Sequence, residues 1–526
     1  MNIPLLIQTV RYLRPTQVAY QLKYRLCRPR LREEALPEMT QSVAMLTEPI
    51  VKPQCYDGKD EFSFLNIAST FQHWNMGEHG PLWSYNLNYM DWMEQEDIST
   101  DECLRWIDKF IDELPGNHVG LDAYPIALRV INWAKFFSKH PECRSKKRLD
   151  SMYAQTRLLE RKLEYHLLGN HLLEDAYSLF IAAIFFTDQR LFHKAETLLL
   201  RQLNEQTLPD GAHYEQSAMY HCIMLDRLLD CINFAKGASQ FSPLTPHLSS
   251  VISHLSSSAA LMLGHLASII YKDGSMPLFN DSAIGIAPSS EQIFDYARRL
   301  DITWEAIPLR ECGYRRLYHG PIEATVDVGN IMASYQPGHS HADTFSYELR
   351  IDGTPFIVDT GISTYNKNER RQYERSTPAH NTVSVGGLDS SRVWGGFRVG
   401  RRATVQLVKD SPSDLVARHD GFGRHTIHQR RFAFNGDVLC IEDEIIGTGN
   451  WQSVSYLHFN PRINVSFVSE ADGVVKAGGV LIKIEGFTKL ELKRNQVATE
   501  YNKLEDCEVL EVFFVQQLKC QFKKDF

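Results

Sequence analysis

Long apolar runs are missing from this sequence. No stretch reaches the roughly 18 to 20 apolar residues that a helix needs to cross a bilayer. The most apolar run, 179–186, has only the length of a buried core segment. The N-terminus has a short apolar run with basic residues after it and no small-residue cleavage site. We therefore expect no transmembrane helix, no secretory signal and a cytoplasmic location.

Close cysteine pairs and a basic excess are missing as well. The ten cysteines are scattered without a CxxC pair, which argues against a disulfide framework or a cysteine zinc site. The chain carries 56 Lys and Arg against 64 Asp and Glu, a net charge of −8. Dedicated nucleic-acid binders usually carry a strong basic excess, so we expect no nucleic-acid partner. An anionic substrate is still compatible, because a local basic cleft can form on an acidic protein.

One basic stretch departs from this acidic average. Residues 367–402 contain eight Lys or Arg and three acidic residues. This stretch is the best candidate surface for a polyanion, and a solvated face is the alternative at even weight. Arg375, which lies in this stretch, is therefore a candidate substrate-binding residue.

The sequence divides into two halves with different hydrophobic periods. Its 526 residues, 43% hydrophobic and 23% charged, are typical of a globular protein of several domains. Apolar spacings of three and four predict helices at 102–114, 121–139, 150–167, 171–187, 190–207, 213–235 and 247–270. After about residue 312, short alternating runs end at pairs such as Asn-Gly, which is typical of antiparallel strands. We expect a helical domain at 1–310 packed rigidly on a β-sandwich domain at 311–526.

The densest group of chemically capable residues lies in the strand half. His339 and His341 belong to Gly-His-Ser-His-Ala-Asp at 338–343, and Asp359 and the Ala-His-Asn at 379–381 follow. Alternate residues of a strand face the same side, so both histidines would face one cavity. Two histidines and a carboxylate form a metal set that suits zinc or non-haem iron. The alternative is a group of hydrogen-bonded core histidines, which the density of the group makes the weaker interpretation.

Polar residues also mark the helical half. Asn170 and His171 open a predicted helix directly after a glycine, where Asn often serves only as a cap. Arg129 and Trp133 lie about one turn apart, and an Arg can clamp a carboxylate while a Trp can stack on a sugar ring. Both are candidate substrate-binding residues. Asn280-Asp281 is weaker, because loop function and simple turn chemistry fit it equally.

A further polar stripe follows an Asp-Gly turn at 210–211. On the helix predicted there, His213, Ser217 and Tyr220 would share one face, and Glu215 lies between them. Polar residues on such a stripe, with Tyr beside His, indicate a face that looks into a cleft. A solvated face is the alternative. His213 and Glu215 are therefore candidate substrate-binding residues.

These residue types suit the removal of a proton from a carbon beside a carboxylate. The carboxylate must be neutralised or hydrogen-bonded, which Asn and His donors or an Arg can do. A tuned Tyr or His can remove the proton, and a Tyr hydroxyl can protonate the leaving oxygen. Asn170, His171, Tyr220 and His339 supply this set for β-elimination at a uronic acid. The paired carboxylates that glycoside hydrolysis needs have no clear candidate.

The sequence also resembles the heparinase II/III-like polysaccharide lyases over about residues 60–460. The motifs that carry the resemblance are LWSYNLNYMDW at 82–92, YPIALRVINW at 124–133, GNHLLEDAYSLF at 169–180, LPDGAHYEQSAMYH at 208–221, GHSHADTFSYELRIDGTPFIVDTG at 338–361 and AHNTV at 379–383. The resemblance implies an α+β multidomain fold, with an N-terminal incomplete (α/α) toroid followed by a C-terminal antiparallel β-sandwich. It also implies an anionic, uronic-acid-containing polysaccharide as the substrate.

The resemblance implies a catalytic role for four matching residues. Asn170 and His171 would bind and neutralise the uronate carboxylate. Tyr220 would act as the catalytic acid and in some cases also as the base. His339 would act as the base for one of the two C5 epimers.

The resemblance further implies a structural divalent metal, usually described as zinc, held by His341, Asp359 and His380. This metal would hold the sandwich loops that face the toroid and would take no part in the chemistry. Arg375 and the stretch 392–402 would then contact the anionic polymer.

Several alternatives stay open at this point. A uronyl C5-epimerase shares the fold and the proton-abstraction step but returns a proton from the other face. A polysaccharide-binding or assembly protein on a lyase scaffold is a second alternative, against which the complete catalytic set argues. The order His341, Asp343, His380 and Arg392 mimics iron/2-oxoglutarate oxygenases, but it leaves the helical residues unexplained. Most such lyases are exported, which makes the periplasm the family alternative, whereas signal-less relatives suggest the editing of a polymer made by the same cell.

Overall fold

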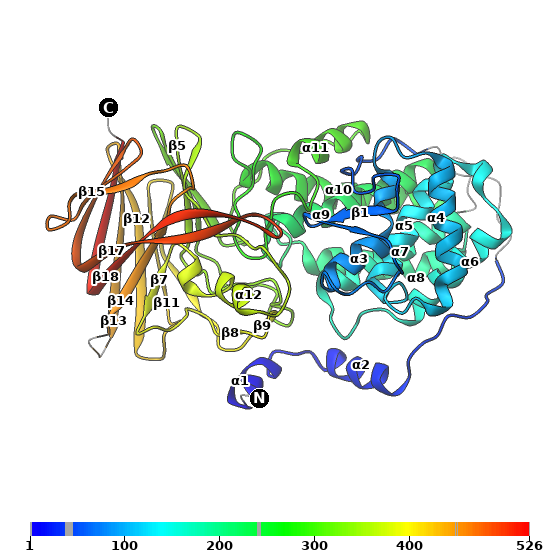
Figure 1. Ribbon diagram of the computed structural model, residues 1–526, viewed down its shortest axis with the longest axis horizontal. Helices are drawn as coiled ribbons and strands as arrows, with labels where there is room; N and C mark the ends of the chain where they lie inside the picture. Colours follow the sequence, from blue (N-terminus) through cyan, green and yellow to red (C-terminus); the bar gives the residue numbers. More distant parts are fainter. Residues whose placement is uncertain (1–2, 37–45, 239–243, 448, 450, 525–526) are drawn as a thin grey trace.

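The computed structural model describes residues 3–36, 46–238, 244–447, 449 and 451–524. A helical body and a strand body lie side by side, and an N-terminal arm runs below both (Figure 1). The helical body is an incomplete (α/α) toroid with the helices α3 Pro81–Tyr89, α4 Thr100–Glu113, α5 Ala123–Lys139, α6 Lys146–Arg161, α7 Gly169–Phe186, α8 Gln189–Gln206, α9 Ala218–Ala238, α10 Thr245–Ile269 and α11 Ser290–Arg299. Within the described ranges, no helix is long and apolar enough to span a bilayer.

Shorter elements precede and connect these helices. They are α1 Ile3–Val10, α2 Pro15–Leu26, the hairpin of β1 Glu61–Phe64 and β2 Ile67–Thr70, and the 3-10 turns η1 Asp91–Glu94, η2 Leu114–Gly116 and η3 Pro141–Cys143. Helix α4 illustrates how the sequence forms an amphipathic member of the toroid. Ser99 caps it by accepting the backbone N–H of Glu102, and its buried stripe includes Trp106 and Phe110.

Helix α7 is the centre of the toroid. It packs against α5, α8 and α9, and all of its residues except His171 are buried. A helix that is apolar around most of its surface is expected in such a position. The chain enters α7 through two residues at positive φ, Leu168 (63°) and Gly169 (61°). This sharp turn directs the N-terminus of α7 at the strand body.

The strand body is a β-sandwich of two antiparallel sheets. The smaller sheet has the order β3-β4-β5-β6, formed by β3 Tyr314–His319, β4 Ile322–Asp327, β5 Tyr347–Ile351 and β6 Thr354–Ile357. The larger sheet has the order β10-β11-β12-β13-β18-β17-β16-β15, and β14 pairs with both β18 and β7. Apolar residues of both sheets, such as Leu349 and Phe514, share one buried core.

The strands of the larger sheet are β7 Val383–Val385, β10 Val405–Ser411, β11 Asp414–His419, β12 Thr426–Asn435, β13 Val438–Gly447, β14 Ser453–His458, β15 Val465–Ser469, β16 Val474–Ala477, β17 Val480–Glu500 and β18 Lys503–Lys524. Four short elements lie between β6 and β10. These are α12 Glu369–Glu374, the 3-10 turn η4 Thr377–Ala379, β8 Val393–Trp394 and β9 Arg398–Val399.

Two segments make extensive contacts across the junction between the bodies. The long β17–β18 hairpin reaches across the junction towards the toroid (Figure 1). At its turn, Asn66 Nδ2 donates a hydrogen bond to the carbonyl of Tyr501 at 2.9 Å. The segment 270–289, between α10 and α11, lies against the sandwich, where the Tyr271 hydroxyl donates to Glu348 at 2.8 Å. The junction is therefore a packed interface.

Helices overlap each of the seven segments in which the hydrophobic spacing predicts one, and the toroid-plus-sandwich architecture is confirmed. The predicted helical stripe of His213, Ser217 and Tyr220 is wrong, because α9 begins only at Ala218. Gln216 adopts a positive φ of 59°, and its carbonyl accepts a hydrogen bond from the Asn280 side chain, so the helix cannot start earlier. The change from helix to strand falls after α11 and before β3, and the division at residue 310 stays a prediction.

Candidate active site at the junction of toroid and sandwich

One buried carboxylate, Asp281, connects the two bodies. It comes from the segment 270–289, and its side chain is 0% exposed. The Arg371 guanidinium donates to both of its oxygens, His339 Nδ1 donates to Oδ2 at 2.8 Å, and His341 Nε2 donates to Oδ1 at 2.8 Å. Burial alone would raise the pKa of Asp281, but Arg371 and the histidine hydrogen bonds outweigh burial and hold this pKa well below its usual range. The carboxylate is therefore ionised and fully satisfied.

The bond to Asp281 determines which nitrogen of His339 is available. Because Nδ1 donates to Asp281, the neutral ring carries its lone pair on Nε2. Nε2 faces the start of α7, where Asn170 Nδ2 donates to it at 3.3 Å, and Glu215 Oε2 lies 3.6 Å away. A ring nitrogen oriented in this way is suited to accept a proton.

Glu215 fixes Asn170 at the N-terminus of α7. The backbone N–H of Asn170 donates to Glu215 Oε1 at 2.9 Å, and its side-chain Nδ2 donates to Oε2 at 2.9 Å. A carboxylate is favoured here by the free N–H groups and the helix dipole. Gly169 is needed as well, since a Cβ at this position would lie 2.5 Å from Glu215 Oε1. Glu215 is 1% exposed and positions Asn170, and a direct contact of Glu215 with substrate stays a prediction.

Tyr220 lies against His339 at the start of α9. The two ring centroids are 3.9 Å apart at an interplanar angle of 32°, and the Tyr220 hydroxyl lies 3.2 Å from the hydroxyl of Tyr365. Burial raises the pKa of Tyr220 more than the hydrogen bond with Tyr365 lowers it. The hydroxyl is therefore protonated at neutral pH, which is the state that a general acid requires.

His171, like Tyr220, is partly exposed to solvent. Its side chain is 28% exposed, its ring contacts Tyr124 edge-on, and its Nδ1 donates to Glu164 Oε2 at 2.9 Å. Burial by itself would lower the pKa of His171, but the adjacent Glu164 carboxylate outweighs burial and raises it. Glu164 in turn has a lowered pKa, because His171 outweighs the effect of burial there too. Together they can present a cation to a carboxylate ligand.

We expect Glu164→Gln to shift the pH dependence of substrate binding. A raised pKa means that the His171 cation persists above the ordinary histidine value of about 6.5 and is lost as the pH rises through the raised pKa. In the variant that loss should occur at lower pH, so KM should rise by about tenfold near neutral pH while kcat changes little. The measurement is kcat/KM against pH for both proteins. If kcat/KM fell at the same alkaline pH in both proteins, Glu164 would not control the charge of His171.

Two residues predicted to bind substrate lie in the core of the toroid. Arg129 is 0% exposed, and its guanidinium donates to Gln155 Oε1 at 2.8 Å and to the carbonyl of Asn88 at 2.8 Å. Trp133 is also 0% exposed and packs edge-on against Phe110. Both side chains of α5 point into the toroid core, which gives no support to a contact with the polymer, and their substrate-binding role stays a prediction.

His213 and Arg375 are buried as well. His213 Nε2 donates to Gln206 Oε1 at 3.0 Å, and burial lowers the pKa of His213 to about 4. Arg375 donates to the carbonyl of Ser340 at 2.8 Å, and burial lowers its pKa to about 9. Both groups make internal hydrogen bonds, and their direct contact with the polymer stays a prediction.

Three residues of this site carry little or no signal in the sequence. Asp281 lies in a loop rich in Pro and Gly, and Arg371 lies in the basic stretch 367–402, where it resembles a solvated charge. Tyr365 carries no motif at all. The one local signal is Asn280, whose side chain accepts the backbone N–H of His341 at 3.0 Å. The basic residues of the stretch that are exposed are Lys367, Arg392 and Arg398.

The predicted metal ligands His341, Asp359 and His380 are neighbours but do not converge. His380 Nδ1 donates to Asp359 Oδ2 at 2.8 Å, and the rings of His341 and His380 have centroids 5.2 Å apart. His341 turns its Nε2 to Asp281, and one Asp359 oxygen is taken by His380, so the three residues do not present their ligand atoms within 4.8 Å of one another. Three polar atoms are nevertheless buried without a partner: Nδ1 of His341, Nε2 of His380 and Oδ2 of Asp343.

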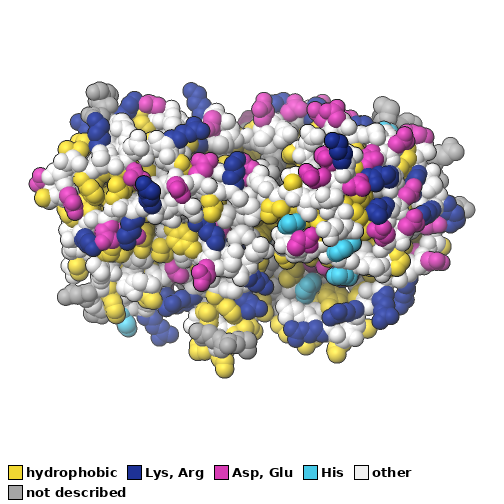
Figure 2. All heavy atoms as spheres, in the orientation of Figure 1, with side chains coloured by type: hydrophobic (Ala, Val, Ile, Leu, Met, Phe, Trp, Pro, Cys, Tyr) yellow, Lys and Arg dark blue, Asp and Glu magenta, His cyan; other side chains and the backbone are white. Residues whose placement is uncertain are grey.

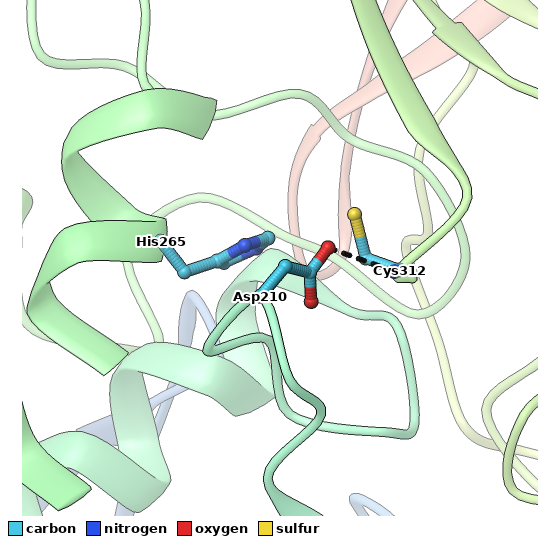
Figure 3. A group of neighbouring side chains, drawn as sticks. All are labelled: Asp210, His265 and Cys312. Atoms are coloured by element: carbon cyan, nitrogen blue, oxygen red, sulfur yellow. Dashed lines mark hydrogen bonds between the residues drawn. The ribbon is translucent and has the colours of Figure 1, made fainter. Parts of the chain in front are cut away.

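A different group in the described part of the chain has the spacing of metal ligands. Asp210, His265 and Cys312 are all buried and point towards one another, with ligand atoms within 4.8 Å (Figure 3). Asp210 Oδ2 also accepts the backbone N–H groups of Arg310 and Cys312, each at 2.9 Å. His265 Nδ1 is buried without a partner. This triad is a possible metal site, and the Asp210 carboxylate also fixes the segment before β3 to the toroid.

Family models match both bodies. Residues 141–299 match the model described as Heparinase II/III N-terminus, and residues 301–517 match the model described as Heparinase II/III-like, C-terminal. A curated heparin-sulfate lyase of Bacteroides thetaiotaomicron is 23% identical over 336 residues, which cover 56% of this chain and 46% of that protein. The match thus spans about half the length of the curated relative.

Solved structures share the fold. A crystal structure of heparinase III superposes with a TM-score of 0.67 at 13% identity, covering 86% of this chain and 79% of that one. The heparan sulfate lyase HepC from Pedobacter heparinus gives a TM-score of 0.56 at 17% identity, covering 97% and 88%. At these identities the likeness concerns the fold. The two family models, which together match most of the chain, show that this chain belongs to the heparinase II/III-like family.

Proposed function

We propose that this protein is a polysaccharide lyase that cleaves a uronic-acid-containing anionic polysaccharide by β-elimination. The observation that carries the proposal is the convergence of Asn170, Tyr220 and His339 from three separate segments on one point of the junction. The family membership and the likeness to a heparin-sulfate lyase support the same reaction class.

The first requirement of the reaction is a neutralised uronate carboxylate. His171 reaches solvent, carries a raised pKa and lies directly beside Asn170 on α7. A carboxylate bound beside the His171 ring would receive a cation near the positive end of the α7 dipole, and it would take an amide N–H of Asn170 by replacing Glu215 or His339 as the acceptor. This arrangement lowers the cost of placing negative charge on the carbon next to the carboxylate.

The second requirement is a base and an acid close together. The base takes the proton from C5, the electron pair forms the C4–C5 double bond, and the C4–O bond breaks. His339 Nε2 is the base that the hydrogen bonds favour, and the charge it gains is stabilised by Asp281. The Tyr220 ring packs against the His339 ring, and the Tyr220 hydroxyl would give its proton to the leaving oxygen.

A panel of soluble uronate polymers tests the proposal. Elimination leaves a conjugated C4–C5 double bond, so the ultraviolet absorbance of the product should rise with time on at least one polymer. No absorbance combined with uptake of solvent deuterium at C5 would instead indicate the C5-epimerase, which shares the proton-abstraction step. Neither signal on any polymer would favour a binding protein and contradict both enzymes.

We further propose that His341, Asp359 and His380 hold a structural divalent cation, with zinc as the expected ion. The unpartnered ring nitrogens of His341 and His380 support this, because neutral imidazole nitrogens are ligands that zinc accepts. Burial lowers the pKa of His341 to about 3, so its ring is neutral and able to ligate. Asp281 would then orient His341 by accepting its Nε2–H, which leaves Nδ1 for the metal, as carboxylates often do for metal-bound histidines.

We expect His380→Ala to lower the bound metal by about one ion per chain and to lower the melting temperature, because a metal that binds only the folded state stabilises it. Elemental analysis and thermal unfolding measure both. The matched variant is His265→Ala, which removes a ligand from the Asp210 triad. Loss of metal in His265→Ala but not in His380→Ala would assign the ion to the triad and contradict the proposed site.

A further inference from the structure

The N-terminal arm, residues 3–32, has a composition unlike the rest of the chain. It contains seven Lys or Arg and no Asp or Glu, in a protein whose net charge is −8. The arm forms α1 and α2 and runs along the outside of both bodies, with α1 below the sandwich and α2 below the toroid (Figure 1). It plays no part in the site described above.

The arm binds the two bodies through its polar and aromatic side chains. On α1, the Thr9 hydroxyl accepts a hydrogen bond from Trp394 Nε1 at 3.1 Å. On α2, Gln17 Nε2 donates to the carbonyl of Tyr335 at 3.2 Å, and the Tyr24 hydroxyl donates to the carbonyl of Leu163 at 2.6 Å. These contacts reach both bodies, so the arm has a defined inner face.

The outer face of the arm is aliphatic. Ile3, Ile7 and Val10 form a stripe on α1, and Val18, Leu22 and Leu26 lie at four-residue spacings on α2 and its end, with exposures of 62%, 63%, 45%, 42%, 55% and 87%. These are six of the eighteen large hydrophobic residues exposed in the described part of the chain. Hydrophobic side chains are visible along the lower edge of the molecule (Figure 2). A helix on a globular protein normally turns its apolar stripe inward, and these two do the reverse.

Cationic side chains flank the aliphatic stripes. Six basic residues are exposed and form no ion pair with any described residue: Arg11, Lys23, Arg25, Arg28, Arg30 and Arg32. Arg14, by contrast, is paired with Glu205. Aliphatic residues that enter the acyl boundary, together with Lys and Arg that meet anionic headgroups, are the features of a helix that lies in a membrane interface.

We propose that residues 3–32 dock this protein on the surface of an anionic lipid bilayer. The aliphatic stripes favour a lipid over the polysaccharide, since a polyanion offers charge but no apolar layer. The charge favours a lipid over a second copy of the chain, because two arms would bring their basic residues together. The inference goes beyond the proposed lyase activity and is tested without any polysaccharide.

Co-sedimentation with vesicles tests this docking. The full-length protein should bind vesicles of phosphatidylcholine with about a quarter phosphatidylglycerol, bind pure phosphatidylcholine at least about tenfold more weakly, and dissociate as salt is added. The triple variants Ile7→Ser/Leu22→Ser/Leu26→Ser and Lys23→Gln/Arg25→Gln/Arg28→Gln should each lower the partition coefficient about tenfold or more. Circular dichroism and thermal unfolding confirm that each variant is folded.

The control is Val408→Ser/Val468→Ser, which removes equally exposed valines (55% and 60%) from the sandwich and should leave vesicle binding unchanged. Equal binding of the wild type and both arm variants would overturn the proposal. So would a concentration-dependent dimer that the aliphatic variant abolishes in the absence of vesicle binding, which would assign the stripe to a second copy. Loss of polymer affinity in the basic variant, again without vesicle binding, would assign the arm to the polysaccharide.

Discussion

Tyr220→Phe is expected to reduce kcat by about a thousandfold or more while KM and the melting temperature stay near the wild-type values. The variant removes one hydroxyl and keeps the ring that stacks on His339. Without this hydroxyl the leaving oxygen has no positioned proton donor, and general acid catalysis typically contributes about 10²–10⁴-fold. Initial rates on the polymer that the wild type cleaves measure the effect.

The matched control is Tyr153→Phe, which removes a hydroxyl that bonds Asp188 far from the junction. It should leave kcat unchanged. Tyr365→Phe should have an intermediate effect, because the Tyr365 hydroxyl contacts the Tyr220 hydroxyl and also lies 3.5 Å from His339 Nδ1. If Tyr220→Phe retained more than about a tenth of the wild-type kcat, the catalytic assignment of Tyr220 would be wrong.

Asp281→Asn is expected to lower kcat by about 100-fold or more and to destabilise the protein. The amide has the shape of the carboxylate but no charge, so it cannot stabilise a protonated His339 or fix its ring nitrogens in the same way. It also leaves the fully buried Arg371 without its anion. Removing one partner of a buried ion pair costs about 3–5 kcal/mol. Thermal unfolding and steady-state kinetics measure the two effects.

Two further variants separate catalysis from stability. Asp281→Asn/Arg371→Gln removes both charges, so it should recover much of the melting temperature but little of kcat. Asp273→Asn alters a half-exposed carboxylate of the same segment, paired with Arg350, and should change neither quantity strongly. If the double variant recovered activity together with stability, Asp281 would have a purely structural role.

Most of the architecture follows from local patterns. The three-to-four spacing of apolar residues predicts each toroid helix that the structure contains between residues 100 and 269. The alternating runs after residue 312 predict the antiparallel strands. The motif residues Asn170, Tyr220 and His339 also come together, because the N-terminal ends of α7 and α9 face the sandwich loop that carries His339.

The structure gives no support to four of the substrate-binding predictions, for a common physical reason. Arg129, Trp133, His213 and Arg375 are of types that contact sugars and carboxylates, but the same types also satisfy buried carbonyls and fill cores. Helical spacing does not tell whether a face looks into the cleft or the core. The central position of Asp281 was not predicted, for a different reason. Its role depends on partners 58 to 90 residues away, and no local pattern in the sequence reveals such contacts.

The most direct test of the account is the fate of solvent oxygen during cleavage of a uronate polymer. The reaction is run in water labelled with heavy oxygen, and the oligosaccharide products are analysed by mass spectrometry. The account predicts products with an unsaturated terminal uronate and no labelled oxygen, all of which disappear with Tyr220→Phe. Saturated products that carry one labelled oxygen at the new end would show hydrolysis and contradict the proposed β-elimination.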